Sequence, residues 1–284
     1  MFFLFPSELT VRTEPSGGDL APKVIPGSPL GLAGHSRVIL FCHGYANSVD
    51  VARNSYGKFL ENFISQFPTA KPIETDVFEF FWPGDEPYPG VSQLSYPVQI
   101  KSAMQSAERL ATYLKTLPAP ATGEIEIYIV AHSLGNRVAL ELLKGLSGGN
   151  VKLTLRGILM MAAAVPVEKV LAGGVLHDPS LLMTRRFVLH SSSDWVLRFA
   201  FPPGETAAGD GFFPQAVGRF GNPAGQWTNS REMPSYGHSD YWPNPATSGM
   251  AARFFGLVAD NAIQRSYIPA YIAAPANKIA KNTI

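Results

Sequence analysis

Short apolar runs alternate along the chain with amphipathic stretches. The run Arg37–Cys42 is apolar after its first residue and ends at His43-Gly44, which is typical of a strand buried on both faces. The segment 98–117 instead repeats apolar residues at intervals of three and four, which predicts a helix with one apolar stripe. Pro118 prevents that helix from continuing.

The same patterns predict the other main elements. Ser48 or Asp50 is a plausible cap for the first helix. Strands that alternate with helices imply right-handed crossovers and a mostly parallel sheet with helices on both faces, which is an α/β fold. We expect a first strand at 1–6, a glycine- and proline-rich surface excursion at 14–35, strands at 76–81, 124–130, 155–161 and 186–190, and helices at 49–67, 134–146 and 248–261.

Composition narrows the class of protein. The chain has 284 residues and is 46% hydrophobic but only 16% charged, so it can bury a sizeable core and is not of a disordered type. A net charge of +1 gives no general attraction for nucleic acid or anionic membranes. The single cysteine, Cys42, excludes an intrachain disulfide and argues against a cysteine-rich metal site.

Organisation and localisation follow from what the sequence lacks. No repeat or linker divides the chain, so we expect one domain over 1–284 with its core at about 36–262. No apolar run reaches the 18 or so residues of a spanning helix, and the first residues do not resemble a signal peptide. These features favour a cytoplasmic, bacterial-type protein with no membrane span.

The residues Ala131-His132-Ser133-Leu134-Gly135 match a nucleophile elbow, with alanine in place of the first glycine. The turn between strand and helix is so sharp that small residues are expected two positions before and after the serine. The turn lifts the serine hydroxyl above the sheet at a helix N-terminus, whose dipole favours developing negative charge. Such a short string also occurs by chance, but its position between a strand and an amphipathic helix is the context that the motif requires.

On these residues the chain resembles the α/β hydrolases. It is more closely similar to a bacterial family that shares a His-Gly-Tyr/Phe-Asn stretch, a Trp-Pro pair and an elbow with the sequence His-Ser-Met/Leu-Gly-Asn-Arg. The resemblance covers about residues 36–260. The elbow and the His-Gly turn occur in many hydrolases, so they identify the fold better than the substrate. The residues that carry the resemblance are His43-Gly44-Tyr45-Ala46-Asn47, Trp82-Pro83 and His132-Ser133-Leu134-Gly135-Asn136-Arg137.

The resemblance implies a base on a loop after the last strand. His238 lies there, before the final predicted helix. His177 precedes the penultimate strand and is better explained as a loop residue. His132 belongs to the elbow and is expected to point away from the serine hydroxyl, whereas His43 belongs to the His-Gly turn and is expected to brace the backbone.

The acid is expected between Ser133 and His238, just after a strand. Asp194 ends the polar turn that follows the strand 186–190, and it would orient the imidazole of His238. Asp178 and Asp210 are competitors, and Asp194 could also be an ordinary turn residue. Asp240 is too near His238 in sequence to reach the same ring well.

The tetrahedral intermediate of such an enzyme needs two backbone donors. The resemblance assigns one to the amide of Leu134, directly after Ser133, and the other to Tyr45 in the turn after the strand 37–42. Related enzymes vary by one residue at the second position. The His-Gly turn could also simply end a strand.

Residues 195–237 are expected to form a long loop rich in aromatic and glycine residues. This loop is either a mobile cover that lines an apolar acyl pocket or a loop that packs its own rings onto the sheet. The histidines and carboxylates do not have metal-ligand spacing, and no phosphate-binding glycine loop occurs. We therefore expect no metal and no cofactor.

Together these features predict a serine hydrolase that cleaves a small-molecule carboxylic ester through an acyl-enzyme. Thioesterase and acyltransferase chemistry could use the same residues. A hydrolase-fold scaffold without activity and a cofactor-free haloperoxidase-like activity are further alternatives. The sequence does not identify the leaving group or the oligomeric state.

Overall fold

The computed structural model describes residues 6–12, 23–25, 32–67, 76–85, 92–118, 123–148 and 152–256. Within these ranges, eight strands form one sheet in the order β2-β1-β4-β3-β5-β6-β7-β8. β2 pairs antiparallel with β1, and the other neighbouring pairs are parallel. The strands are β1 (Ser7–Thr10), β2 (Lys23–Ile25), β3 (Arg37–Cys42), β4 (Val77–Phe81), β5 (Ile125–His132), β6 (Leu153–Met161), β7 (Arg185–His190) and β8 (Asn229–Glu232).

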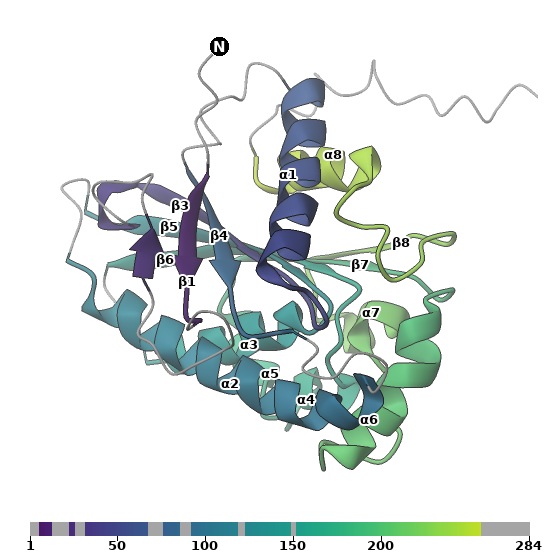
Figure 1. Ribbon diagram of the computed structural model, residues 1–284. Coiled ribbons are helices and arrows are strands. Elements are labelled where there is room, and N and C mark those ends of the chain that lie inside the picture. The colour runs from purple at the N-terminus through teal and green to yellow at the C-terminus, as the bar shows by residue number, and fades with distance from the viewer. Residues whose placement is uncertain are drawn as a thin grey trace, which may run out of the picture.

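Helices cover both faces of this sheet (Figure 1). α1 and α8 lie together on one face, and α2 to α7 lie on the other. The α-helices are α1 (Val49–Gln66), α2 (Ser92–Thr116), α3 (Gly135–Leu146), α4 (Val167–Val170), α5 (His177–Leu181), α6 (Phe201–Ala207), α7 (Val217–Phe220) and α8 (Pro245–Phe254).

The strand β3 shows how the two faces are filled. Val38 and Leu40 belong to the core on the α2 and α3 side, whereas Ile39 and Phe41 belong to the core on the α1 and α8 side. All four side chains are at most 3% exposed. Alternate residues of a strand point to opposite faces, so a strand with helices on both sides needs a continuous apolar run. Each such side chain contributes about 1.5–3 kcal/mol by its burial.

The predicted α/β fold is confirmed, and the predicted core strands agree with the structure to within two residues. The first predicted helix is α1, and its cap is Ser48 rather than Asp50. The Ser48 side chain accepts a hydrogen bond from the amide of Val51 at 3.3 Å, which satisfies one of the unpaired donors at the helix start.

Two helices begin earlier than the patterns indicate. α2 begins at Ser92 rather than at 98 and continues through Pro97. α8 begins at Pro245 rather than at 248, because the Asn244 side chain caps it by accepting the amide of Ala246 at 2.9 Å. Proline is compatible with the first turn because that turn needs no amide donor.

Several predicted boundaries fall on residues that are not described. The strand expected at 1–6 lies outside the described residues except for Pro6, and the strand found nearby is β1. The excursion expected at 14–35 is described only at 23–25 and 32–35, where β2 pairs with β1 and a 3-10 turn, η1 (Leu32–Gly34), precedes β3. The helix expected to reach 261 is α8, which ends at Phe254 within the described residues, so that predicted end is wrong. The chain turns at Gly256, whose φ of 67° is typical of the residue that follows a helix.

The long loop expected at 195–237 is not a loop. It contains α6, α7 and β8 together with the π-helical turn η3 (Val196–Ala200) and the 3-10 turn η4 (Pro223–Gly225). The helices are too short to show a period, and β8 is a polar edge strand with mostly exposed residues, so neither shows a pattern of buried positions. Whether this segment moves as a cover stays a prediction.

Candidate active site

Ser133 lies in the turn between β5 and α3, at the carboxyl end of the sheet. Its φ of 52° is in the left-handed region, which is strained for a residue with a side chain. The buried side chain of Asn136 holds this turn in place. Its Nδ2 atom donates to the carbonyl oxygens of Ala131, Ser133 and Met161 at 3.2, 3.1 and 3.1 Å.

Two glycines let the turn after β3 approach this serine closely. A Cβ atom at position 44 would lie 2.8 Å from the Cβ of Ser133, and one at position 135 would lie 2.4 Å from the carbonyl oxygen of His43. The need for a small residue at 135 is therefore explained by the neighbouring turn. The conflict that requires a small residue at 135 thus lies between two turns and not, as the sequence predicts, within the elbow alone.

The structure brings together the three side chains that the sequence singles out. The Ser133 hydroxyl lies 2.8 Å from Nε2 of His238, and Nδ1 of the same ring lies 2.8 Å from Oδ2 of Asp194. Asp194 is fully buried, and its Oδ1 atom accepts the amide of Leu197 at 3.0 Å. Both oxygens of the carboxylate are thus bound, which fixes its orientation.

The direction of the hydrogen bonds follows from this arrangement. A carboxylate can only accept, so Nδ1 of His238 donates its proton to Asp194. The neutral ring then has an unprotonated Nε2, which accepts the hydroxyl proton of Ser133. The serine is therefore hydrogen-bonded to a group that can take its proton.

His132 contacts the loop that carries His238, a role that the sequence does not indicate. Its Nε2 donates to the backbone oxygen of His238 at 2.7 Å, and its ring packs beside those of Tyr241 and Trp242. Burial lowers the pKa of His132 to about 3, so the ring is neutral at neutral pH. As expected, it is not the hydrogen-bond partner of the Ser133 hydroxyl.

His43 braces the backbone, as its place in the His-Gly turn predicts. Nδ1 donates to the carbonyl of Gly44 at 2.8 Å, and Nε2 accepts the amide of Trp82 at 3.3 Å. The indole of Trp82 stacks on the ring and donates to the His43 carbonyl at 2.8 Å. Burial lowers the pKa of His43 to about 4. Burial also raises the pKa of the neighbouring Cys42 thiol, which therefore stays protonated and does not compete as a nucleophile.

The two residues expected to supply backbone donors lie on either side of the serine. Leu134 occupies the N-cap position of α3, where amide groups have no partner within the helix. Tyr45 lies in the turn that Gly44 brings against Ser133, and the side chain of Asn47 donates to its carbonyl oxygen at 2.8 Å. Their roles as donors stay predictions.

The competing acids and the second histidine are engaged elsewhere. Asp178 contacts His177 at 2.8 Å on an exposed part of α5. Asp240 accepts the amide of Gly237 at 2.6 Å within the loop of His238. Asp210 forms ion pairs with Arg137 and Lys169, outside the Ser133–His238–Asp194 chain.

A buried ionic cluster connects α3 to the segment after Asp194. Arg137, the second residue after Gly135, pairs with Glu141 on its own helix at 2.9 Å and with Asp210 at 2.7 Å. Lys169 binds the other oxygen of Asp210 at 2.9 Å. Arg137 is only 2% exposed, so this cluster fixes the segment after α6 to the helix that begins at the elbow.

Comparison with known proteins assigns the family. The family described as alpha/beta hydrolase of unknown function (DUF900) matches residues 30–194. The chain belongs to this family of α/β hydrolases. The matched range contains Ser133 and Asp194 and ends before His238.

The similar proteins of known structure are distant. A protein described as a hydrolase from Agrobacterium vitis S4 is 12% identical over 82% of this chain and 91% of its own, with a TM-score of 0.43. A protein described as a cell surface hydrolase from Lactobacillus plantarum WCFS1 is 11% identical over 82% and 96%, with a TM-score of 0.47. MenH from S. aureus is 11% identical over 78% and 94%, with a TM-score of 0.39. No curated protein matches the chain.

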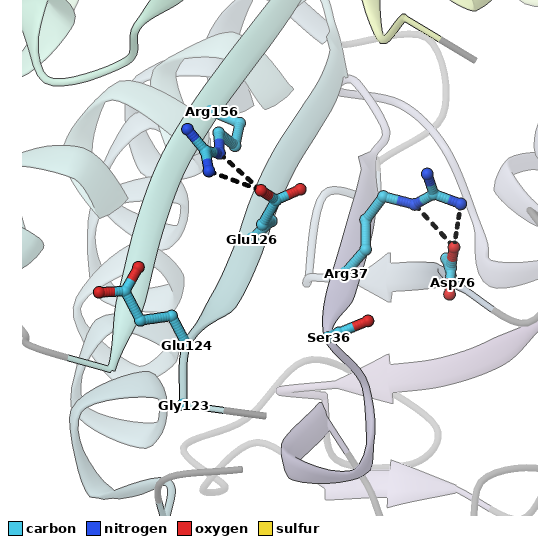
Figure 2. Close-up of a pocket in the computed structure, with 7 residues that line it drawn as sticks. All are labelled: Ser36, Arg37, Asp76, Gly123, Glu124, Glu126 and Arg156. Carbon is cyan, nitrogen blue, oxygen red and sulfur yellow. Dashed lines mark hydrogen bonds and ion pairs between the residues drawn. The ribbon is translucent and has the colours of Figure 1, made fainter. Parts of the chain in front are cut away.

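A hollow of this α/β hydrolase lies at the opposite ends of the strands from Ser133 (Figure 2). It has a volume of about 570 Å³ and is lined by charged residues from the starts of β3, β5 and β6. Arg37 pairs with Asp76 at 2.5 Å and Arg156 with Glu126 at 2.6 Å. Four of the charged side chains are thus paired on an open surface, and the residues that line it include no histidine or cysteine.

Among the described residues, no group of three or more histidine, cysteine, aspartate or glutamate side chains has the arrangement of a metal site. Among the described helices, none combines the length and the apolar character needed to cross a membrane.

Proposed function

We propose that this α/β hydrolase is a serine esterase that cleaves a carboxylic ester through an acyl-enzyme. The observation that carries the proposal is the unbroken chain of hydrogen bonds from Ser133 through His238 to Asp194, 2.8 Å at each step. These distances suit direct proton transfer between the heavy atoms.

In the first half of the reaction, Ser133 Oγ attacks the ester carbonyl while Nε2 of His238 takes the hydroxyl proton. Asp194 accepts the Nδ1–H bond throughout and stabilises the imidazolium. His238 then gives its proton to the leaving alcohol oxygen as the C–O bond breaks, which leaves the acyl group on Ser133.

In the second half, water replaces the alcohol. His238 takes a proton from water, the hydroxide attacks the acyl carbon, and the proton returns to Ser133 Oγ as the acid leaves. The amides of Leu134 and Tyr45 stabilise the negative oxygen in both halves. The strained turn at Ser133 supports the proposal because it places the serine beside the N-terminus of α3.

The test is the rate of hydrolysis of p-nitrophenyl esters of increasing chain length. We expect turnover by the wild type and a loss of roughly four to six orders of magnitude in kcat for Ser133→Ala. The matched control is Ser55→Ala, which removes an exposed hydroxyl of α1 that bonds only to the carbonyl of Val51.

Equal rates for wild type and Ser133→Ala would contradict the proposal. Thioesters and amides of the same acyl groups, tested beside the esters, identify the leaving group that the site prefers. A scaffold without activity would turn over none of the three substrate classes.

A further inference from the structure

A second cavity lies between the π-helical turn η3 and the helices α6 and α7. Its volume is about 360 Å³, which is within the range of small-molecule sites. Ser133, His238 and Asp194 do not line it. It is therefore a separate feature of the segment that follows Asp194.

Two arginines bring positive charge to the cavity, and the guanidinium of Arg198 lies 5.0 Å from the centroid of the Phe199 ring. Arg198 and Arg219 are the charged residues that line it. Within the part of the chain that the structure describes, neither guanidinium forms an ion pair, and Nε of Arg219 is buried without a hydrogen-bond partner. Glu232 borders the lining through Ser192, whose hydroxyl donates to it at 2.6 Å, but Glu232 itself does not line the cavity. A buried donor without a partner costs free energy, and a guanidinium also has terminal N–H groups that can bind an anion.

The same cavity has an apolar side. Phe213 and Phe220 line it and are 56% and 54% exposed. Phenyl rings of this exposure mark binding surfaces when they cluster with polar groups. The side chains therefore offer two kinds of contact within one cavity, two guanidinium groups for an anion and two phenyl rings for a hydrocarbon chain.

The framework around these groups is fixed to the body of the protein. The amide of Gly218 on α7 donates to the carbonyl of Ala163 at 2.8 Å, and the Ser191 amide donates to the Gly218 carbonyl at 3.0 Å. A Cβ atom at position 218 would lie 2.1 Å from the backbone of Ala163. α7 thus holds Arg219 and Phe220 in place before any ligand arrives, which lowers the entropic cost of binding.

We propose that this cavity binds a single-chain anionic amphiphile, with Arg198 and Arg219 on the anionic group and Phe213 and Phe220 on the hydrocarbon chain. Guanidinium groups bind carboxylates and phosphates through paired hydrogen bonds, so both anions fit. The inference goes beyond the proposed function, because it requires no reaction at Ser133.

Calorimetric titration of the Ser133→Ala protein tests the proposal without hydrolysis. The ligands are octanoate and octyl phosphate, with octanol and inorganic phosphate as probes of the chain alone and the anion alone. We expect at least one of the two anionic octyl ligands to bind about tenfold or more tightly than either control, because both ends of the amphiphile contribute. The comparison of octanoate with octyl phosphate shows which anionic group the arginines prefer.

Variants assign the contacts to this cavity. Arg219→Gln and Arg198→Gln are expected to weaken the preferred ligand by about tenfold or more each, and Phe220→Ala is expected to weaken it by a smaller factor. Arg231→Gln on β8 is the matched control, because it removes an exposed arginine outside the cavity. Thermal unfolding verifies that each variant is folded.

Three results would overturn the proposal. The first is that octanol binds as tightly as the anionic ligands. The second is that Arg198→Gln and Arg219→Gln leave the binding unchanged. The third is that the protein binds anionic lipid vesicles but neither octyl ligand. Because the titrations use Ser133→Ala, a failure of the esterase proposal leaves these outcomes intact.

Discussion

The two ends of the sheet carry different kinds of polar residues. At the amino ends of the strands, Arg37, Asp76, Glu126 and Arg156 line a hollow, and their ion pairs lie on a partly exposed surface (Figure 2). At the carboxyl ends, Ser133 and Asp194 are buried, His238 is half-buried, and the three side chains form a directed chain of hydrogen bonds. The two ends therefore differ in the burial and in the direction of their polar contacts.

The two arrangements differ in the free energy that they cost the folded protein. Exposed ion pairs form at little cost and contribute little. A strained serine, a buried carboxylate and two neutral buried histidines each lower stability unless their surroundings fix them. Such costs concentrate at functional sites, so the carboxyl end is where substitutions are expected to change chemistry rather than only stability.

The largest expected effect contrasts one aspartate from each end. Asp194→Asn is expected to lower kcat about 10⁴-fold, because an amide at this position favours the wrong tautomer of His238. Asp76→Asn at the opposite end is expected to leave kcat within about twofold, since it affects only the partly exposed contacts with Arg37 and His35. Steady-state ester hydrolysis measures both variants. Similar losses in the two would show that the ends are not functionally distinct.

The next effect concerns the close approach of the two turns. Gly135→Ala is expected to lower the free energy of unfolding by about 1–3 kcal/mol, because the new Cβ meets backbone atoms of the neighbouring turn. Gly57→Ala in α1 is the control, because its Cβ would meet nothing within 4 Å. That change is expected to stabilise by about 0.5–1 kcal/mol. Urea unfolding gives both values, and a stabilised Gly135→Ala protein would contradict the packing described.

The pH dependence of stability follows from four buried groups. The folded-state pKa values of His43 and His132 are lowered to about 4 and about 3, so stability falls as the pH drops below about 6.5, where the unfolded histidines take up protons. Burial raises the folded-state pKa values of Glu79 and Glu205 to about 8. Their contribution to the free energy of unfolding is therefore full below about pH 4.5 and is lost as the pH rises towards 8. Between about pH 4.5 and 6.5, the histidines and the glutamates change the stability in opposite directions. Stability is expected to decline below about pH 4.5 and above about pH 6.5.

Urea unfolding at several pH values tests this profile. Each group changes the free energy of unfolding by up to about 1.4 kcal/mol per pH unit within its window. Glu205→Gln is expected to reduce the decline between about pH 6.5 and 8 relative to wild type, because one of the two glutamates no longer ionises. Glu61→Gln, a change at an exposed position of α1, is the control. An unchanged alkaline decline in Glu205→Gln would show that this carboxyl does not contribute.

The smallest effect is expected at the amino ends of the strands. Glu126→Gln combined with Arg156→Gln removes an ion pair whose side chains are 36% and 44% exposed. The free energy of unfolding is expected to change by less than about 1 kcal/mol, and the rate of ester hydrolysis is expected to stay at the wild-type value. A substantial loss of activity would mean that the hollow at these ends takes part in the function.

Much of the fold follows from local patterns. The run Arg37–Cys42 has to be a strand covered on both faces, and the three- and four-residue spacing of 98–117 has to be a helix. β8 could not be predicted in this way, because it is polar and has one strand neighbour, β7. Its pairing depends on a partner about 40 residues away, which no local pattern records.

The candidate site divides in a similar manner. The elbow at Ser133 is local, and the chain order of the fold family identifies Asp194 and His238. The contacts of His132 and Asn136 were not predictable, because each depends on a carbonyl group from another part of the fold, that of His238 or of Met161. Backbone acceptors carry no signature in the sequence.

The most direct test of the central claim is covalent labelling with a fluorophosphonate, measured by the mass of the intact protein and of its peptides. The account predicts one adduct per chain on the peptide containing Ser133, and no adduct in Ser133→Ala. It also predicts slow labelling of Asp194→Asn, because the hydroxyl then lacks a correctly oriented base. Labelling that persists in Ser133→Ala, or a wild type that stays unlabelled, would contradict the claim that Ser133 is an activated nucleophile.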